Sequence, residues 1–453
     1  DVSISGIVFD SRKCSQGELF VAMPGANQNG ETHIPDALKR GAVAVITEGP
    51  IKDWGVPVVR VPNARRALSH LAKMFFQHPS SRVVLIGITG TKGKTTTTYL
   101  LQSILGQKFG KTFRFGTVEY DLGSVIKPAK NTTPESLELT GMIQESLQQG
   151  VRAGVMEVSS HALKTFRVED LAFAAAGFSN LTMEHTEFHP TMEDYFQAKR
   201  RLFLDLLPAN HMAVVGIDDD WGKRLADELK TAGRSVWTVS IKEYSADFCV
   251  EKLEMSGLGS HFRILAEEKF HDCQVHLPGP FNVFNAVMAA ALARSVGVSW
   301  EEILNGLNAI RQVPGRFESI PNQRGLTVIV DYAHSPASLE NVLMAVRPLT
   351  RGRVISVFGC GGNRSPDKRP IMGRLSATLA DITVVTSDNP RKEKPEEIIS
   401  QIMAGIFDLS PDQRHEVHTE VDRRKAIESA VGMARAGDVI SWNRKAAISL
   451  VVV

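Results

Sequence analysis

Residues 90–95, GTKGKT, are of the types found in loops that bind phosphate groups. Gly90 and Gly93 allow tight turns that expose backbone N–H groups, while Lys94 adds a positive charge and Thr95 offers a hydroxyl to Mg²⁺. The full pattern for such loops has a glycine where this chain has Ile88, and the alternative is a glycine-rich turn without a ligand. We predict an ATP site whose contacting residues are Gly90, Thr91, Lys92, Gly93, Lys94, Thr95 and Thr96.

The elements on either side of this loop are those that a phosphate site requires. Residues 83–86 form a continuous apolar run, which indicates a buried strand, and the apolar spacing after the loop predicts a helix with Gly106 as its C-cap. Strands and helices go on alternating over residues 81–313, which favours a mostly parallel sheet with helices on both faces. Ligands of such sheets bind at the carboxyl ends of the strands.

Polar side chains follow several of these strands. Glu157 ends one strand, and Mg²⁺ prefers a few carboxylates together with phosphates, so we expect Glu157 to hold Mg²⁺ beside Thr95. His185 follows another strand, where it can contact a ligand at the edge of the sheet. The alternative is a histidine that is hydrogen-bonded in the core. The three aspartates at 218–220 indicate a solvated loop rather than a metal site.

Lys199 has an unusual place in the next predicted helix. That helix begins after Pro190 with Thr191 as its N-cap, and Lys199 shares a face with apolar residues such as Phe196 and Phe203. Burial there favours the neutral amine, which can react. The alternative is a lysine whose charged end extends past the apolar face into water.

Length and composition limit the class of protein. The 453 residues are enough for about two to four domains, with boundaries that we place near residues 80 and 313. The net charge of +2 does not indicate a surface for nucleic acid, and no apolar run is long enough to span a membrane. Four cysteines without paired spacing predict reduced thiols in a cytoplasmic protein.

Two further regions have their own patterns. Residues 245–277 alternate around a glycine-rich turn, which predicts a β-hairpin inserted on the central domain. From residue 314 the chain again alternates strands and helices, and strand ends are followed by Asp331, Arg364 and Arg391. The two arginines can hold a carboxylate in fork geometry, and ordinary surface charge is the alternative.

Nine motifs occur in one order along the chain: GTKGKTT, NTTP, EVSSHAL, FSNLTMEHTEFH, FNVFNA, PGRFE, DYAHSP, FGCGGNR and DNPR. Through them the chain resembles the Mur ligases, ATP-dependent enzymes that form amide bonds in peptidoglycan synthesis, from Asp10 to about Ile440. The members that add the third amino acid of the peptide are the most similar. The resemblance implies an α/β protein of three domains: a small UDP-substrate domain (1–80), a central ATP-binding domain (81–313) and a Rossmann-like amino-acid-binding domain (314–453).

The resemblance also implies roles for individual residues. ATP and the first Mg²⁺ are assigned to Lys94, Thr95 and Glu157, and a second Mg²⁺ to His185. Lys199 matches the lysine that the family converts with CO₂ into a metal-binding carbamate. Residues near the adenosine and phosphates are Asn282, Asn285, Arg316 and Asp331. The UDP end of the substrate is assigned to Phe9, Ser11, Ala26, Asn27 and Gln28. The muramoyl-peptide part is assigned to Asn131, Thr132, Thr133, Ser159, Thr165 and Arg167, where Thr165 replaces a glutamine of some relatives. The incoming amino acid is assigned to Arg364, Asp388, Asn389, Pro390 and Arg391.

The implied reaction joins meso-diaminopimelate to UDP-N-acetylmuramoyl-L-alanyl-D-glutamate through an acyl phosphate, in a cytoplasmic monomer that holds two Mg²⁺ ions. Arg391 in DNPR favours diaminopimelate over L-lysine, because only diaminopimelate has a distal carboxylate. The alternatives are the lysine-adding ligases, folylpolyglutamate synthase and an inactive nucleotide-binding homologue.

The end of the chain departs from the family pattern. After Ile440 the family continues into a GKGHE motif that contacts the amino acid, whereas this chain has SWNRKAAISLVVV. We therefore expect a truncated third domain that lacks a late strand and helix.

Overall fold

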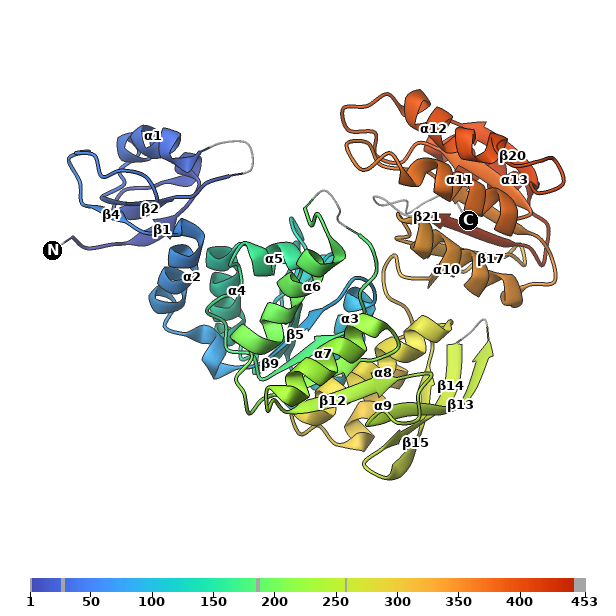
Figure 1. Ribbon diagram of the computed structural model, residues 1–453, viewed down its shortest axis with the longest axis horizontal. Coiled ribbons are helices and arrows are strands. Elements are labelled where there is room, and N and C mark those ends of the chain that lie inside the picture. The colour runs from blue at the N-terminus through green and yellow to red at the C-terminus, as the bar shows by residue number, and fades with distance from the viewer. Residues whose placement is uncertain (1, 26–28, 185–187, 257–258, 444–453) are drawn as a thin grey trace.

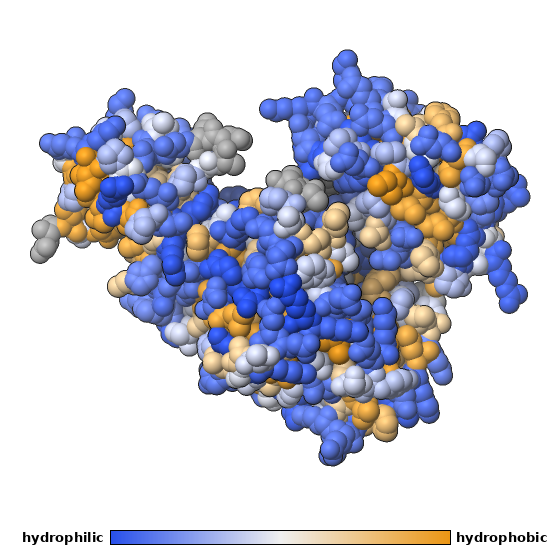
Figure 2. Space-filling view, in the orientation of Figure 1, coloured by the Kyte–Doolittle hydropathy of each residue, from blue (hydrophilic) through white to orange (hydrophobic). Residues whose placement is uncertain are grey.

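The computed structural model describes residues 2–25, 29–184, 188–256 and 259–443, which form three α/β units, each with its own sheet (Figure 1). The sheets contain four, eleven and six strands over these residues. Figure 1 shows the N-terminal unit at the upper left and the C-terminal unit at the upper right, with the central unit below and between them. Figure 2 shows mainly hydrophilic residues on this face of all three units. No helix of the described residues is long and apolar enough to cross a bilayer.

The N-terminal unit is a small parallel sheet in the order β1-β2-β3-β4. Its apolar residues form one cluster on each face of the sheet, and α2 covers one of them with Ala64 and Leu68. The elements are β1 (Gly6–Val8), β2 (Glu18–Ala22), α1 (Ile34–Lys39), β3 (Ala44–Thr47), β4 (Val58–Arg60) and α2 (Ala64–Phe75), with short turns η1 (Ser11–Lys13), η2 (Gly30–His33) and η3 (Pro79–Arg82).

The central sheet has the order β15-β14-β13-β12-β11-β10-β5-β9-β6-β7-β8. Strands β13 to β6 in this order are parallel, whereas β14, β15, β7 and β8 extend the two edges in antiparallel pairs. The sheet is therefore mixed, and the expectation of a mostly parallel sheet holds only for its middle. Its strands are β5 (Val84–Thr89), β6 (Thr112–Phe115), β7 (Glu119–Asp121), β8 (Ile126–Pro128), β9 (Ala153–Glu157), β10 (Ala175–Phe178), β11 (Met212–Gly216), β12 (Val236–Ser240), β13 (Phe248–Ser256), β14 (Gly259–Ala266) and β15 (Lys269–Val275).

Helices cover both faces of the central sheet, as predicted. α3, α8 and α9 pack on one face, and α4, α5, α6 and α7 pack on the other. The helices are α3 (Lys94–Phe109), α4 (Ser136–Gln148), α5 (Ser160–Lys164), α6 (Met192–Arg201), α7 (Asp220–Thr231), α8 (Pro280–Ser295) and α9 (Trp300–Ala309), and α6 continues as the π-helical turn η4 (Leu202–Leu206).

Two local predictions in this unit were wrong. Helix α3 does not end at Gly106; it continues to Phe109, and Gly110, with a φ of 72°, is the C-cap. The predicted hairpin over 245–277 is a meander of three antiparallel strands, β13 to β15, attached to β12.

The C-terminal sheet has the order β16-β17-β21-β18-β19-β20, and every pair except β16–β17 is parallel. The apolar residues form one cluster on each face. The elements are β16 (Glu318–Ser319), β17 (Thr327–Asp331), α10 (Pro336–Val346), η5 (Arg347–Leu349), β18 (Val354–Phe358), α11 (Lys368–Leu379), β19 (Ile382–Thr386), α12 (Pro395–Phe407), β20 (Glu416–Glu420), α13 (Arg423–Met433) and β21 (Val439–Asn443).

The expected truncation of this unit is not supported. Residues 441–443, which follow the point where the chain departs from the family pattern, belong to β21, and β21 pairs with β17 on one side and β18 on the other. All five of its residues are buried. The altered segment thus supplies three of the five residues of a strand inside the sheet; residues 444–453 lie outside the described residues.

Candidate functional site

The predicted phosphate loop lies between β5 and α3, and neighbouring atoms leave no room for a side chain at either of its two glycines. Gly90 and Gly93 have φ values of 138° and 86°. A Cβ atom at Gly90 would lie 2.0 Å from Ser179 Oγ, and one at Gly93 would lie 2.4 Å from Asn285 Oδ1. Ile88 is fully buried in β5 opposite Glu157 of β9, so the missing glycine of the full pattern falls on a strand residue.

Lys94 opens α3 and turns back over this loop. Its Nζ donates hydrogen bonds to Gly90 O at 2.8 Å and Thr91 O at 3.0 Å. Burial lowers the pKa of the Lys94 amine, although the Glu157 carboxylate opposes this shift. The amine is thus held where the phosphates of a nucleotide would meet the N-terminus of α3.

Glu157 and Thr95 meet at the carboxyl end of β9, as the strand pattern predicts. Thr95 Oγ1 donates to Glu157 Oε1 at 3.0 Å, and Thr117 donates to the same carboxylate through N (2.9 Å) and Oγ1 (3.0 Å). Arg316, which precedes the C-terminal sheet, donates through Nη2 to Thr95 Oγ1 at 3.0 Å. Glu157 is buried, with 1% of its surface exposed.

These oxygen donors fit Mg²⁺. A carboxylate and a hydroxyl beside a phosphate loop are the ligands that this ion takes together with phosphate oxygens and water. The described residues contain no group of three or more His, Cys, Asp or Glu side chains placed to hold a metal by themselves. His185, the residue predicted for a second ion, lies outside the described residues.

Lys199 is buried on α6, as its spacing predicts. Thr191 Oγ1 caps the helix by accepting a hydrogen bond from Asp194 N at 3.1 Å. Only 1% of Lys199 is exposed, so its amine does not extend into water. Nζ donates to Gly90 O at 2.9 Å and lies 4.5 Å from the centre of the Tyr195 ring.

Two lysines therefore approach one carbonyl, because Lys94 and Lys199 both donate to Gly90 O. Burial, followed by repulsion from the Lys94 charge, holds the pKa of Lys199 well below its usual range. The site thus favours an uncharged, reactive amine at Lys199 beside the phosphate loop.

The residues assigned to the muramoyl peptide lie around Glu157. Thr133 Oγ1 donates to Glu157 O at 2.8 Å, and Ser159 N donates to Thr133 Oγ1 at 3.0 Å. Thr132 Oγ1 lies 3.1 Å from Thr117 Oγ1. Arg167 donates to Thr133 O at 2.9 Å and pairs with Glu135 at 2.9 Å.

The other described residues assigned to the UDP substrate contact neighbours other than Glu157. Asn131 is exposed and contacts Tyr120 through its backbone. Thr165 is the C-cap residue of α5, and its hydroxyl donates to His161 O of that helix at 2.6 Å. Phe9 and Ser11 follow β1 in the N-terminal unit. Ala26, Asn27 and Gln28 lie outside the described residues.

The residues assigned to the adenosine and phosphates of ATP lie on α8 and in the C-terminal unit. Asn282 and Asn285 are buried, and Asn285 Oδ1 accepts a hydrogen bond from Thr97 Oγ1 at 3.3 Å, next to Gly93. Asp331 ends β17, where Phe317 N donates to its carboxylate at 2.8 Å and burial raises its pKa.

The residues assigned to the incoming amino acid come from two adjacent strand ends. Arg364 follows β18, whereas Asp388, Asn389, Pro390 and Arg391 follow β19. The Arg391 guanidinium donates to Gly362 O, and its backbone has a φ of 52°. The structure thus brings the predicted loops together.

Glu184 and Thr117 were not predicted from the sequence. Glu184 Oε1 accepts from Lys92 Nζ at 2.9 Å and lies 3.0 Å from His334 Nε2 of the C-terminal unit. Burial disfavours its charge, but His334 and Lys92 outweigh this and hold the pKa of Glu184 far below its usual range. The signal available for both residues was their place in the segments that follow strands β10 and β6.

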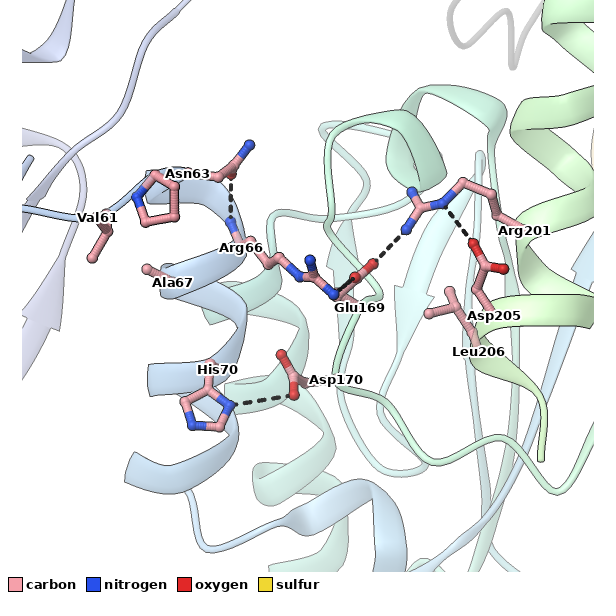
Figure 3. Close-up of a pocket in the computed structure, with 11 residues that line it drawn as sticks. Val61, Asn63, Arg66, Ala67, His70, Glu169, Asp170, Arg201, Asp205 and Leu206 are labelled. Atoms are coloured by element: carbon pink, nitrogen blue, oxygen red, sulfur yellow. Dashed lines mark hydrogen bonds and ion pairs between the residues drawn. The ribbon is translucent and has the colours of Figure 1, made fainter. Parts of the chain in front are cut away.

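A cavity of about 690 Å³ lies between α2 and the segment from α6 into η4 (Figure 3). Its charged residues pair with each other: Glu169 contacts Arg66 and Arg201, and Asp205 contacts Arg201. None of the predicted site residues lines it, and we assign it no ligand.

Comparison with known proteins identifies the family. Three models match along the chain: the Mur ligase family catalytic domain at residues 3–76, the Mur ligase middle domain at 88–293 and the Mur ligase glutamate ligase domain at 315–442. The UDP-N-acetylmuramoyl-L-alanyl-D-glutamate--2,6-diaminopimelate ligases of Fusobacterium nucleatum and Aquifex aeolicus are 38% and 40% identical, each over 97% of this chain and 88% of the relative.

Solved structures agree with this result. A ligase with the same description is 29% identical, with a TM-score of 0.71 over 97% of this chain and 89% of the other. A folylpolyglutamate synthase of Mycobacterium tuberculosis, complexed with ADP and AMPPCP, has a TM-score of 0.68 at 16% identity over 83% of this chain and 92% of the other, which shows a shared fold alone. From the family models and the sequence identity over nearly its whole length, the chain belongs to the Mur ligase family.

Proposed function

We propose that this chain is an ATP-dependent ligase that adds meso-2,6-diaminopimelate to UDP-N-acetylmuramoyl-L-alanyl-D-glutamate in peptidoglycan precursor synthesis. The main support is the identity of 38–40% to ligases of that activity over 97% of the chain. The contacts among Thr95, Glu157 and Lys94 at the phosphate loop agree with ATP as the energy source.

The reaction has two steps. The D-glutamyl carboxylate attacks the γ-phosphorus of ATP, which gives an acyl phosphate and ADP. The amine of the incoming amino acid then attacks the acyl carbon, loses a proton and displaces inorganic phosphate. Lys94 and the N–H groups of residues 90–95 offset the negative charge that otherwise keeps the carboxylate and the triphosphate apart.

Magnesium, when bound, neutralises phosphate charge and orients the γ-phosphoryl group. Thr95 and Glu157 are the residues that would hold the first ion, and we assign the second to His185 and Lys199. The neutral form of the Lys199 amine can add CO₂ and lose a proton, which gives a carbamate whose two oxygens share one negative charge. Its burial and low pKa support this assignment.

The remaining site residues are assigned from the motifs through which the chain resembles the Mur ligases. We place the UDP end at Phe9, Ser11 and residues 26–28, and the muramoyl peptide at residues 131–133, Ser159, Thr165 and Arg167. We place the adenosine and phosphates of ATP near Asn282, Asn285, Arg316 and Asp331. Domain boundaries near residues 80 and 313 agree with the three separate sheets. We also propose a cytoplasmic monomer; its four cysteines are free and buried, as in a reducing compartment.

Arg391 is proposed to select diaminopimelate. One of its N–H groups donates to Gly362 O, and a guanidinium has further donors for a carboxylate. Replacing Arg391 by alanine should raise the KM for diaminopimelate by about 10- to 100-fold, because a charge-assisted fork is lost. Arg374→Ala, which removes an exposed arginine paired with Asp408, is the matched control. An unchanged KM for diaminopimelate in Arg391→Ala would contradict this role.

The proposed function itself is tested by phosphate release from ATP with the UDP-dipeptide substrate. The assay compares diaminopimelate, L-lysine and no amino acid. We expect release to depend on both the UDP substrate and diaminopimelate. Preference for lysine would identify a lysine-adding ligase, and release that needs neither substrate would contradict the proposal.

A further inference from the structure

The two loops proposed to bind the incoming amino acid contact each other through their backbones. Gly362 N, after β18, donates to Asn389 O, after β19, at 2.8 Å. A Cβ atom at Gly362 would lie 1.9 Å from Pro390 O, and one at Gly359 would lie 2.2 Å from Thr386 O. The position of either loop therefore depends on the other.

Each loop also contains a residue in a strained backbone conformation. Asn363 and Arg391 are not glycines, yet their φ values are 50° and 52°. Such conformations persist only where surrounding contacts enforce them, and they concentrate at ligand-binding sites. Here Lys392 N donates to Asn363 Oδ1 at 3.0 Å, and Glu393 N donates to Pro390 O at 2.9 Å.

An ion pair between Arg369 and Glu393 connects the two loops. Arg369 of α11 is 1% exposed and pairs with Glu393 in a fork, with Nη1–Oε2 at 2.8 Å and Nη2–Oε1 at 3.0 Å. Nη1 also donates to Gln401 Oε1 of α12 at 2.7 Å. Glu393 Oε1 in addition accepts from Asn363 N, in the other loop.

We propose that the Arg369–Glu393 pair positions the two amino-acid-binding loops and thereby sets the enzyme's selection of its amino acid. Glu393 contacts Asn363 of one loop and follows Arg391 of the other by two residues, so its carboxylate fixes the strained residues of both. Arg369 fixes Glu393 by a bidentate contact that only a guanidinium can make. This role rests on the proposed function, because it assumes that these loops bind the incoming amino acid.

The test uses Glu393→Gln, which keeps the shape of the side chain but removes its charge. We expect the KM for diaminopimelate to rise about tenfold or more, because small displacements of a binding group have large kinetic effects. The KM values for ATP and the UDP-dipeptide should stay within about twofold, and discrimination against lysine should fall. Arg369→Lys, which keeps the charge but loses the fork, should show the same pattern more weakly.

Asp408→Asn is the matched control, since Asp408 is the C-cap residue of α12 and pairs with Arg374 of α11 away from the loops. The proposal fails if Glu393→Gln behaves like Asp408→Asn, or if all three KM values change together with the melting temperature. It also fails if both test variants lose their fold, because the pair is then structural. The wild-type assay separates the two questions. Phosphate release that needs neither the UDP-dipeptide nor an amino acid contradicts the proposed function, whereas an unchanged KM for diaminopimelate in Glu393→Gln contradicts only the role of this ion pair.

Discussion

At the scale of single residues, the chemistry of the site depends on two buried lysines beside one carbonyl. Lys94 is expected in any phosphate loop, whereas Lys199 comes from a helix more than a hundred residues later and still donates to Gly90 O. Two neighbouring ammonium groups repel each other in a buried site, and this repulsion adds to burial in lowering the pKa of Lys199. The depressed pKa of Lys199 gives it a larger neutral fraction near neutral pH than an exposed lysine has.

If Lys199 is carbamoylated, activity depends on CO₂. We expect phosphate release to fall in CO₂-depleted buffer and to recover when bicarbonate is added. Lys199→Ala should lose roughly 100- to 1,000-fold in kcat, the size of effect seen when a group that stabilises transition-state charge is removed. Lys223→Ala, which removes an exposed lysine paired with Glu243, should keep wild-type activity. Full activity of Lys199→Ala would refute the role.

At the scale of elements, the contact between α3 and α9 places the phosphate loop's helix against the rest of the central unit. Gly306 of α9 faces α3, and a Cβ atom there would lie 2.5 Å from Ile104 Cα. Ser103 Oγ donates to Gly306 O at 2.8 Å across the same contact. Gly106, one turn further along α3, has open space beside it.

Alanine substitutions at Gly306 and Gly106 are a matched pair of stability tests. Gly306→Ala should destabilise the protein by about 1–3 kcal/mol, because the helices must separate. Gly106→Ala should stabilise it by about 0.5–1 kcal/mol, since alanine restricts the unfolded chain and fits the helix. Urea denaturation followed by circular dichroism measures both. A Gly306→Ala variant as stable as Gly106→Ala would show that the contact between the helices is loose.

The elements also show where sequence patterns were insufficient. Gly106 resembled a C-cap, yet Phe109 extends the apolar spacing by one more turn and Gly110 provides the positive φ. The third strand of the meander was missed because its turn, Glu267 and Glu268, has φ values of 52° and 61° without the Asn-Gly signature that usually marks such turns. Glu267 also pairs with Arg294, a contact distant in sequence.

At the scale of the whole molecule, the alternation of strands and helices predicted three α/β units, and strand ends predicted where ligands gather. The contacts between units could not be predicted, because they join residues far apart in the chain. Arg316 reaches Thr95, and Ser335 Oγ accepts from Lys92 Nζ at 3.2 Å. Arg65 of the N-terminal unit pairs with Glu135 at 3.1 Å. These contacts place the phosphate loop against the C-terminal unit and the proposed peptide site against the N-terminal unit.

The central claim is that the γ-phosphoryl group passes to the substrate carboxylate before the amide bond forms. The most direct test uses UDP-dipeptide labelled with ¹⁸O in the D-glutamyl carboxylate, together with ATP and diaminopimelate, and measures the isotope in the released phosphate by mass spectrometry. An acyl phosphate transfers one labelled oxygen to each phosphate, so we predict labelled phosphate in proportion to product. Unlabelled phosphate alongside amide product would contradict the account.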